Sequence, residues 1–175
     1  VATLQTSALT NGDHLITAVY TSNANSFGTS TSTKFNQRVN QAPTITSVVS
    51  DSFLIGTSRT FNFTATGFPA PSFSTLGILP KGLRLSSGGV LTGTPATGTG
   101  GIYSFTVVAS NDFGQDASVS FTLTVNEPAS FTSPDTTTFT SGAAESFRLA
   151  AKGFPAATFR VANNSTLPNG LSITS

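Results

Sequence analysis

The residues that could carry chemistry are few, and they fall in no catalytic pattern. The only histidine, His14, lies in an alternating stretch where a ring would pack near a turn, so we interpret it as structural. No two acidic residues stand in a motif that glycoside hydrolysis or metal-assisted hydrolysis requires. The acidic residues are Asp13, Asp51, Asp112, Asp116, Glu127, Asp135 and Glu145.

Motifs for nucleophilic catalysis and phosphate binding are also missing from the sequence. The serines form no Gly-x-Ser-x-Gly elbow. The glycine-rich run at 98–101 is not followed by the Lys-Ser/Thr pair and helix of a phosphate-binding loop. We therefore predict that the chain is not an enzyme, and we assign no catalytic residue, no cofactor-binding residue and no metal ligand.

Composition narrows the class of protein further. Charged residues make up 9% of the 175 residues, against about 25% in ordinary soluble domains. The net charge of +1 gives no basic patch for nucleic acid, and no apolar run approaches the roughly 20 residues that span a bilayer. There is no cysteine for a disulfide or a thiolate metal site. The chain lacks methionine and starts at Val1, so we interpret it as an internal piece of a longer protein.

The stretch from Gly101 to Val125 is the clearest structural element, and it predicts a β-hairpin. Apolar and polar residues alternate along both arms, which indicates two strands with one buried and one wet face. The residues expected on the buried face are Tyr103, Phe105, Val107 and Ala109 in the first arm and Ala117, Val119, Phe121, Leu123 and Val125 in the second.

Residues 42–126 form one complete domain in this interpretation. Seven short strands separated by turn signals are typical of an Ig-like sandwich. Tyr103 stands where such a sandwich has its tyrosine corner, and Phe105 is expected in the core. The predicted strands are 44–50, 59–66, 72–76, 82–85, 90–94, 102–111 and 116–125, and the stretch from Asn40 to Pro43 is expected to be a linker.

The two flanking segments are predicted to be partial domains. Residues 1–41 look like the closing half of a β domain, with a strand at 12–20, a turn at 21–28 and a last strand at about 29–40. Residues 127–175 repeat the sequence pattern of the first part of the middle domain. Gly67-Phe68-Pro69-Ala70 recurs 86 residues later as Gly153-Phe154-Pro155-Ala156, and Leu79-Pro80-Lys81-Gly82-Leu83 recurs as Leu167-Pro168-Asn169-Gly170-Leu171.

These motifs resemble known families. Leu79-Pro80-x-Gly82-Leu83, the run from Gly89 to Pro95 and the alternation from Tyr103 to Asn111 resemble the putative-Ig repeat of large bacterial surface proteins. The segment 1–41 resembles the closing half of another bacterial Ig-like repeat. The resemblance implies an all-β chain of tandem Ig-like, cadherin-like β-sandwiches, with one complete domain (42–126) and two partial ones (1–41 and a truncated copy, 127–175).

The resemblance also sets the functional expectations. It implies a non-catalytic structural spacer or stalk in a large, adhesin-like, secreted or cell-surface bacterial protein. The alternative is a carbohydrate- or protein-binding module, or an accessory region of an extracellular enzyme. A planar cluster of Phe68, Phe113 and Phe154 would favour glycan binding.

Partners and ions follow from the same interpretation. The expected partners are neighbouring Ig-like domains of the parent, and the partial domains are expected to complete their cores with missing segments of the parent or head-to-tail with another copy. No cofactor is expected. Calcium at the junctions is the alternative that the cadherin-like resemblance raises, and its candidate ligands are Asn40, Gln41, Asn111, Asp112, Asp116, Asn126 and Glu127.

Overall fold

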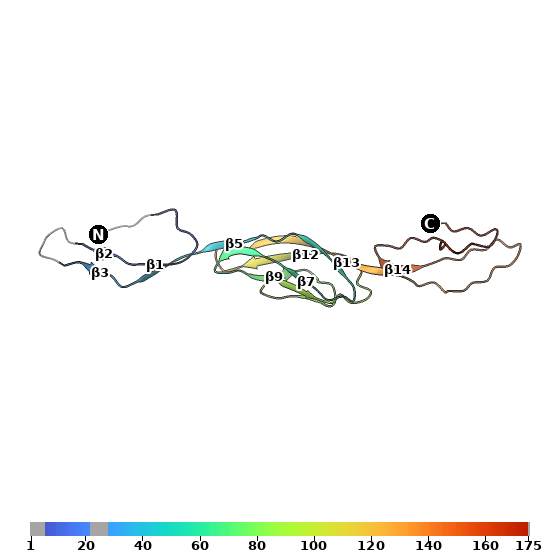
Figure 1. The fold of residues 1–175 in the computed structure, drawn as a ribbon, viewed down its shortest axis with the longest axis horizontal. Coiled ribbons are helices and arrows are strands. Elements are labelled where there is room, and N and C mark those ends of the chain that lie inside the picture. The colour runs from blue at the N-terminus through green and yellow to red at the C-terminus, as the bar shows by residue number, and fades with distance from the viewer. Residues whose placement is uncertain (1–5, 22–27, 175) are drawn as a thin grey trace.

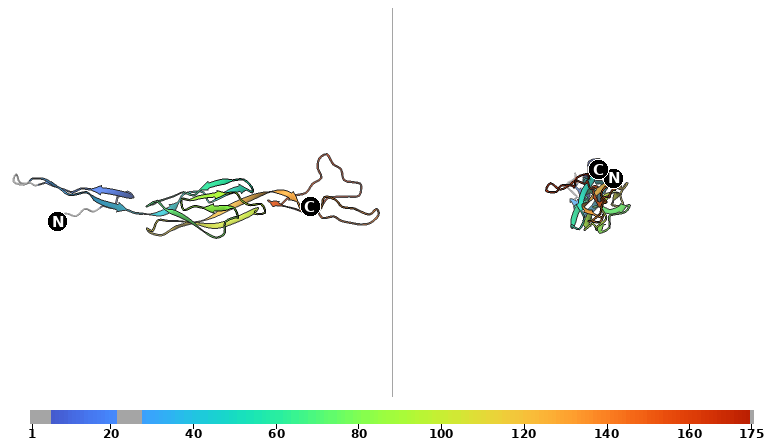
Figure 2. Two further views of the ribbon diagram at one scale, coloured as in Figure 1. Left: turned by 90° about the horizontal axis from the view of Figure 1, so that it is seen from below. Right: turned by 90° about the vertical axis from the view of Figure 1, so that its right-hand side faces the viewer.

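The computed structural model describes residues 6–21 and 28–174 of the chain. The molecule is elongated, and strands β1–β4 (within 12–39) and strand β14 (151–154) lie toward opposite ends of its long axis (Figures 1 and 2). Three parts follow one another along that axis. They are the N-terminal segment (6–21 and 28–40), the middle sandwich (41–126) and the C-terminal segment (127–174). All regular elements in the described residues are strands, which confirms the predicted all-β class.

The middle sandwich holds nine strands that fall into three groups by pairing. A five-stranded sheet contains β9, β12, β13, β14 and β6, and β14 belongs to the C-terminal segment. A three-stranded sheet has the order β10-β11-β7, and β5 pairs with β8. The strands are β5 (Gln41–Ile45), β6 (Ser50–Leu54), β7 (Arg59–Asn62), β8 (Ala65–Phe68), β9 (Ser72–Leu76), β10 (Leu83–Leu85), β11 (Val90–Gly93), β12 (Gly101–Ser110) and β13 (Ala117–Phe131).

The hairpin of β12 and β13 supplies most of the core, as its alternation predicts. Its register pairs Phe105 with Phe121 and Val107 with Val119. Both phenylalanines are almost fully buried, and the ring of Phe121 lies 4.9 Å from those of Phe61 and Phe63. The fully or nearly fully buried apolar residues are Phe53, Phe63, Leu91, Phe105, Val107, Ala109, Phe121, Leu123 and Val125.

Tyr103 occupies the predicted tyrosine corner. Its hydroxyl donates a hydrogen bond to the backbone carbonyl of Thr99, four residues upstream, at 2.8 Å. This contact ties the loop before β12 to the start of that strand, as the corner does in other sandwiches.

Two strand predictions in the middle sandwich were wrong in detail. The predicted strand 59–66 is divided into β7 and β8, which pair with different partners, β11 and β5. Apolar and polar residues keep alternating from β7 through to β8, so the sequence pattern gives no sign that the chain moves from one sheet to another there. The predicted strand 44–50 is replaced by β5 and β6, and Val48 and Val49 between them are exposed. β6 forms because it pairs in parallel with β13, and it places Phe53 in the core.

The predicted linker at 40–43 is also wrong. Gln41 already belongs to β5, and Pro43 is buried within that strand. The register of β5 against β8 shifts between Gln41 and Thr44, and a proline can be accommodated at such an irregularity because it needs no ladder donor there. At the other end β13 continues past Val125 to Phe131 without a break.

The flanking segments contain fewer strands. In the N-terminal segment β1 (Gly12–Ile16) pairs with β4 (Phe35–Val39), and β2 (Val19–Tyr20) pairs with β3 (Ser30–Thr31). The predicted last strand at 29–40 is therefore interrupted, and part of the predicted turn, 22–27, lies outside the described residues. In the described part of the C-terminal segment β14 (Ala151–Phe154) pairs with the end of β13.

Candidate functional site

Two of the polar residues singled out by the sequence, Asn111 and Glu127, lie at opposite ends of the middle sandwich, where it meets its neighbours. At the first of these junctions Asn111 is the central side chain. It is buried, and its Nδ2 donates to the carbonyls of Gln41 at 2.7 Å and Pro69 at 2.8 Å. Its Oδ1 accepts from the amide of Phe113 at 3.2 Å. One amide side chain thus joins β5, the loop after β8 and the turn after β12.

The N-terminal segment contacts the same junction through side chains. The Arg38 guanidinium lies 5.5 Å from the centre of the Phe68 ring, a distance that allows a cation–π contact. Asn11 donates through Nδ2 to Oε1 of Gln41 at 2.8 Å. β4 and β5 are separated by Asn40 alone. The N-terminal segment is therefore attached to the middle sandwich by both a very short connection and side-chain contacts.

Arg38 is held in place by Asp13 on the neighbouring strand. Its Nε and Nη2 donate to the two carboxylate oxygens of Asp13 at 2.8 and 3.1 Å, a bidentate pair. These hydrogen bonds lower the pKa of Asp13 and raise that of Arg38. Both groups are exposed, so the pair orients the guanidinium toward Phe68 rather than adding much stability.

Glu127 holds the second junction together as Asn111 holds the first, but it accepts hydrogen bonds from backbone amides, whereas Asn111 donates to backbone carbonyls. Its two carboxylate oxygens accept from the amides of Gly98 and Gly100, at 3.0 and 3.1 Å. A side chain at Gly100 would begin 2.7 Å from Cβ of Glu127 and 2.9 Å from Cβ of Phe154. Only glycine allows this approach, so the loop before β12 packs directly against Glu127 and Phe154 of the C-terminal segment.

The strand pairing at the two junctions is the same, 86 residues apart. Gln41 pairs with Phe68 at the first junction, and Glu127 pairs with Phe154 at the second. The register then shifts and resumes at Thr44–Thr66 and Ile45–Ala65 in one case, and at Ser130–Lys152 and Phe131–Ala151 in the other. The Gly-Phe-Pro motif recognised in the sequence therefore occupies an equivalent position at each junction.

The remaining chemical candidates are dispersed. Nε2 of His14 lies 2.7 Å from the carbonyl of Thr10, a local contact in the first turn. Asp51 lies 3.7 Å from Arg59. Within residues 6–21 and 28–174, no three histidine, aspartate or glutamate side chains gather where they could hold a metal ion. Of the calcium candidates, Gln41, Asn111 and Glu127 make the side-chain hydrogen bonds described above, which the sequence did not predict.

The three phenylalanines whose clustering would favour glycan binding are divided between the junctions. Phe68 lies in β8 at the first junction and Phe154 in β14 at the second. Phe113, in the turn after β12, is 39% exposed. The planar cluster of all three rings that would favour glycan binding is therefore not formed.

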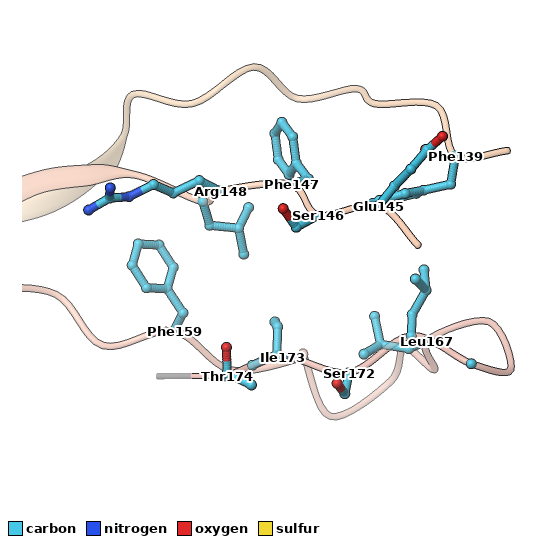
Figure 3. A pocket seen from close by; sticks show the side chains of 13 residues that line it. Phe139, Glu145, Ser146, Phe147, Arg148, Phe159, Leu167, Ser172, Ile173 and Thr174 are labelled. Carbon is cyan, nitrogen blue, oxygen red and sulfur yellow. The ribbon is translucent and has the colours of Figure 1, made fainter. Parts of the chain in front are cut away.

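The C-terminal segment contains an open cleft of about 700 Å³. Leu167, Ile173 and Phe159 project into it from one side, and the stretch from Glu145 to Arg148 forms the other side (Figure 3). Most of its larger lining side chains are apolar, including Phe139, Phe147, Leu149, Phe159, Leu167, Leu171 and Ile173. It offers no cluster of acid, base and nucleophile.

Comparison with known proteins shows which family this fold belongs to. The family model described as "Putative Ig domain" matches residues 15–126, more than half of the chain. The match begins inside β1 and ends at Asn126, so it takes in most of the N-terminal segment as well as the middle sandwich. No curated protein matches the chain. The described residues contain no helix long and apolar enough to span a membrane.

Several solved structures are similar in part. One is described as a putative alpha-galactosidase from Bacteroides fragilis NCTC 9343, with 24% identity and a TM-score of 0.44 over 51% of this chain, which spans only 19% of that one. The N-terminal four Ig domains of Dscam1 isoform 4.44 show 23% identity and a TM-score of 0.48, covering 73% of this chain and 38% of that one. Titin domain M7 shows 22% identity and a TM-score of 0.39, covering 51% and 98%.

Proposed function

Because the chain belongs to the Putative Ig domain family, we propose that it is a non-catalytic spacer in a large secreted or cell-surface bacterial protein of the adhesin type. In this proposal the domains are 1–41, 42–126 and 127–175, arranged as tandem Ig-like repeats, and their partners are the neighbouring domains of the same parent. The spacer holds a distal part of the parent away from the surface. Its mechanism is geometric, since it needs no reaction and no bound ion.

The observation that carries this proposal is the construction of the junctions. A spacer must resist bending, and flexible connections between domains would defeat it. Here Asn40 alone separates β4 from β5 at the first junction, and β13 runs without a break through the second. A side chain fastens each junction: Asn111 the first and Glu127 the second. These contacts support an extended arrangement of the three parts along one axis (Figure 1).

The test is the stiffness of the second junction. The chain has no cysteine, so spin labels can be placed on cysteines introduced at Ser118 and Lys152, one on each side of the junction. Pulsed electron paramagnetic resonance then measures the distribution of distances between them. We expect a narrow distribution in the parent protein and one at least twice as broad in Glu127→Ala, because the loop at 98–100 loses both acceptors.

Asp135→Ala provides the control, since this exposed carboxylate lies beyond the junction. It should leave the distribution unchanged. A broad distribution in the parent protein would refute the spacer proposal, because the two parts would then move independently.

Recognition of a glycan or protein is the second candidate function, and the exposed ring of Phe113 is the observation in its favour. Loops at the end of a sandwich often carry binding residues. A glycan array probed with the whole chain distinguishes the two functions. The spacer proposal expects no reproducible binding, whereas binding that Phe113→Ala abolishes would establish the module as a receptor.

A further inference from the structure

The two junctions are fastened at an equivalent place in the fold. The β1–β4 hairpin has the register of the β12–β13 hairpin, since Gly12 pairs with Val39 as Gly101 pairs with Val125. The residue just before the first hairpin, at position 11, therefore corresponds to Gly100. The residues that these positions contact correspond as well, because positions 41 and 127 make equivalent pairs with the two Gly-Phe-Pro motifs.

The chemistry at this place differs between the junctions. At the second junction the donors to Glu127 are backbone amides, those of Gly98 and Gly100. At the first junction the donor is a side chain, because Nδ2 of Asn11 bonds to Oε1 of Gln41 at 2.8 Å. A side-chain amide can be lost by hydrolysis, whereas a backbone amide persists for as long as the chain is intact. Of these two contacts, the one at the first junction therefore depends on a group that can be removed chemically.

The residue after Asn11 makes this side-chain amide labile. Gly12 has a φ of +132°, a conformation that residues with side chains rarely adopt, so the fold requires glycine there. Glycine has no side chain to shield its backbone nitrogen, and an asparagine that precedes glycine forms a cyclic imide most readily among these thermolabile residues. The other asparagine before a glycine, Asn169, lies in the turn from Pro168 to Leu171, within the C-terminal segment.

We propose that Asn11 is a site of spontaneous deamidation, and that the reaction loosens the first junction as the protein ages. The backbone nitrogen of Gly12 attacks Cγ of Asn11, so a bond forms between these two atoms and the bond from Cγ to Nδ2 breaks. Nδ2 leaves as ammonia, with the proton from the glycine nitrogen. Water then opens the cyclic imide at Cγ to give aspartate, or at the backbone carbonyl carbon to give isoaspartate.

Both products lose the donor on which the contact with Gln41 depends. A carboxylate only accepts hydrogen bonds, so an acceptor then faces the acceptor oxygen of Gln41. Aspartate can regain a bond if the Gln41 amide turns over and donates. Isoaspartate also inserts one further carbon into the main chain immediately before β1, so it is the product that loosens the junction most. The contact of Arg38 with Phe68 and the short connection through Asn40 remain, so the two parts stay attached.

This inference goes beyond the spacer function, because a spacer can act without a junction that changes with age. It predicts that the first junction loses stiffness irreversibly, whereas the second, which Glu127 fastens to backbone amides, retains it. The two proposals fail separately. The test of the spacer concerns the second junction in fresh protein, and the test of this inference concerns the change at the first junction over time.

Peptide mapping by mass spectrometry, after incubation in mildly alkaline buffer, tests the reaction itself. Trypsin releases residues 1–34 as one peptide, and electron-transfer fragmentation locates the added mass and distinguishes aspartate from isoaspartate. Asn111 is the internal reference, because three hydrogen bonds hold its side chain. Those bonds must break before Asn111 can react, so Asn11 should convert at least about tenfold faster. An unmodified Asn11, or equal rates at the two residues, would overturn the proposal.

Spin labels across the first junction test the consequence. Cysteines introduced at Lys34 and Ser118, which are both exposed, place one label on each side. The distribution of distances between the labels should become at least twice as broad as isoaspartate accumulates. Asn11→Gln is the matched control, because it retains a side-chain amide but cyclises far more slowly. Whatever its initial width, the distribution of this variant should stay constant over the same incubation.

Two results of the spin-label experiment would refute the effect on the junction. One is a distribution that stays constant while Asn11 converts to isoaspartate. The other is an equal broadening in Asn11→Gln, which would show that ageing acts on the junction through some other residue.

Discussion

Replacement of Phe105 is the most direct test of the assigned core. Its side chain is 3% exposed, and its ring lies 5.4 Å from that of Phe121. Burying a phenylalanine contributes up to about 3 kcal/mol, and an aromatic pair adds about 1 kcal/mol. The sum, about 4 kcal/mol for Phe105→Ala, agrees with the roughly 3–5 kcal/mol typical of buried phenylalanine truncations.

This loss is close to the whole stability of a domain of this size, about 5–10 kcal/mol, so a milder substitution is needed beside it. Phe105→Leu retains most of the volume and should cost about 1–1.5 kcal/mol. With a urea dependence of about 1 kcal/mol per molar, its unfolding midpoint should fall by roughly 1 M. Phe105→Ala should fall much further or be unfolded without urea.

The assay is urea unfolding followed by tyrosine fluorescence. Tyr103 is partly buried in the middle sandwich and bonded to Thr99, whereas Tyr20 is exposed, so the change in emission reports mainly on the middle sandwich. Thr122→Ala, on the outer face of β13, is the matched control and should shift the midpoint little. Midpoints unchanged in both Phe105 variants would show that the strand phase, and with it the assigned core, is wrong.

Three further predictions concern single contacts. Tyr103→Phe should cost about 1–2 kcal/mol in urea unfolding, because it removes the corner hydrogen bond and leaves a carbonyl without its partner; an unchanged midpoint would refute the corner's role. Gly89 has φ of +84°, and a Cβ there would lie 2.7 Å from the carbonyl oxygen of Phe63, so Gly89→Ala should cost about 2–3 kcal/mol; a neutral result would contradict that close approach. Arg38 lowers the pKa of Asp13, so their pairing supports the β1–β4 hairpin above the ordinary aspartate pKa and is lost as the pH falls through the lowered one. In NMR titrations the Asp13 carboxyl should therefore titrate at lower pH than in Arg38→Gln, and equal titrations would disprove the pairing.

Much of the fold follows from local pattern, and the family match bears out the Ig-like class. Alternation gave the correct phase of β12 and β13, and the position of Tyr103 relative to Phe105 gave the corner. Such features depend on neighbours in sequence, where a period of two decides which side faces the core.

The errors arose where distant segments decide the structure. β6 is held by parallel pairing with β13, about 70 residues later, and its sequence from Ser50 to Leu54 has no clean alternation of its own. The change of sheet after Phe63 keeps the same period on both sides, so no local signal marks it.

At the junctions the sequence indicated which polar side chains are present, but not which groups they bond to. Oxygen-bearing side chains at the domain ends suggested calcium, yet the carboxylate of Glu127 accepts from amides almost 30 residues upstream, and Asn111 donates to a carbonyl 70 residues upstream. A sequence shows which groups can accept or donate. The fold determines which partner is near enough to be chosen.

The parallel pairing of β6 with β13 also determines how the middle sandwich would carry a mechanical load. Tension along the array pulls β6 from its N-terminal end and β13 from its C-terminal end, so the two strands are drawn past each other lengthwise. Five residue pairs, from Ser50–Thr122 to Leu54–Asn126, then bear the force together. Strands peeled apart from one end would lose their hydrogen bonds one after another. In shear they must yield nearly at once, which makes this pairing the mechanical clamp of the domain.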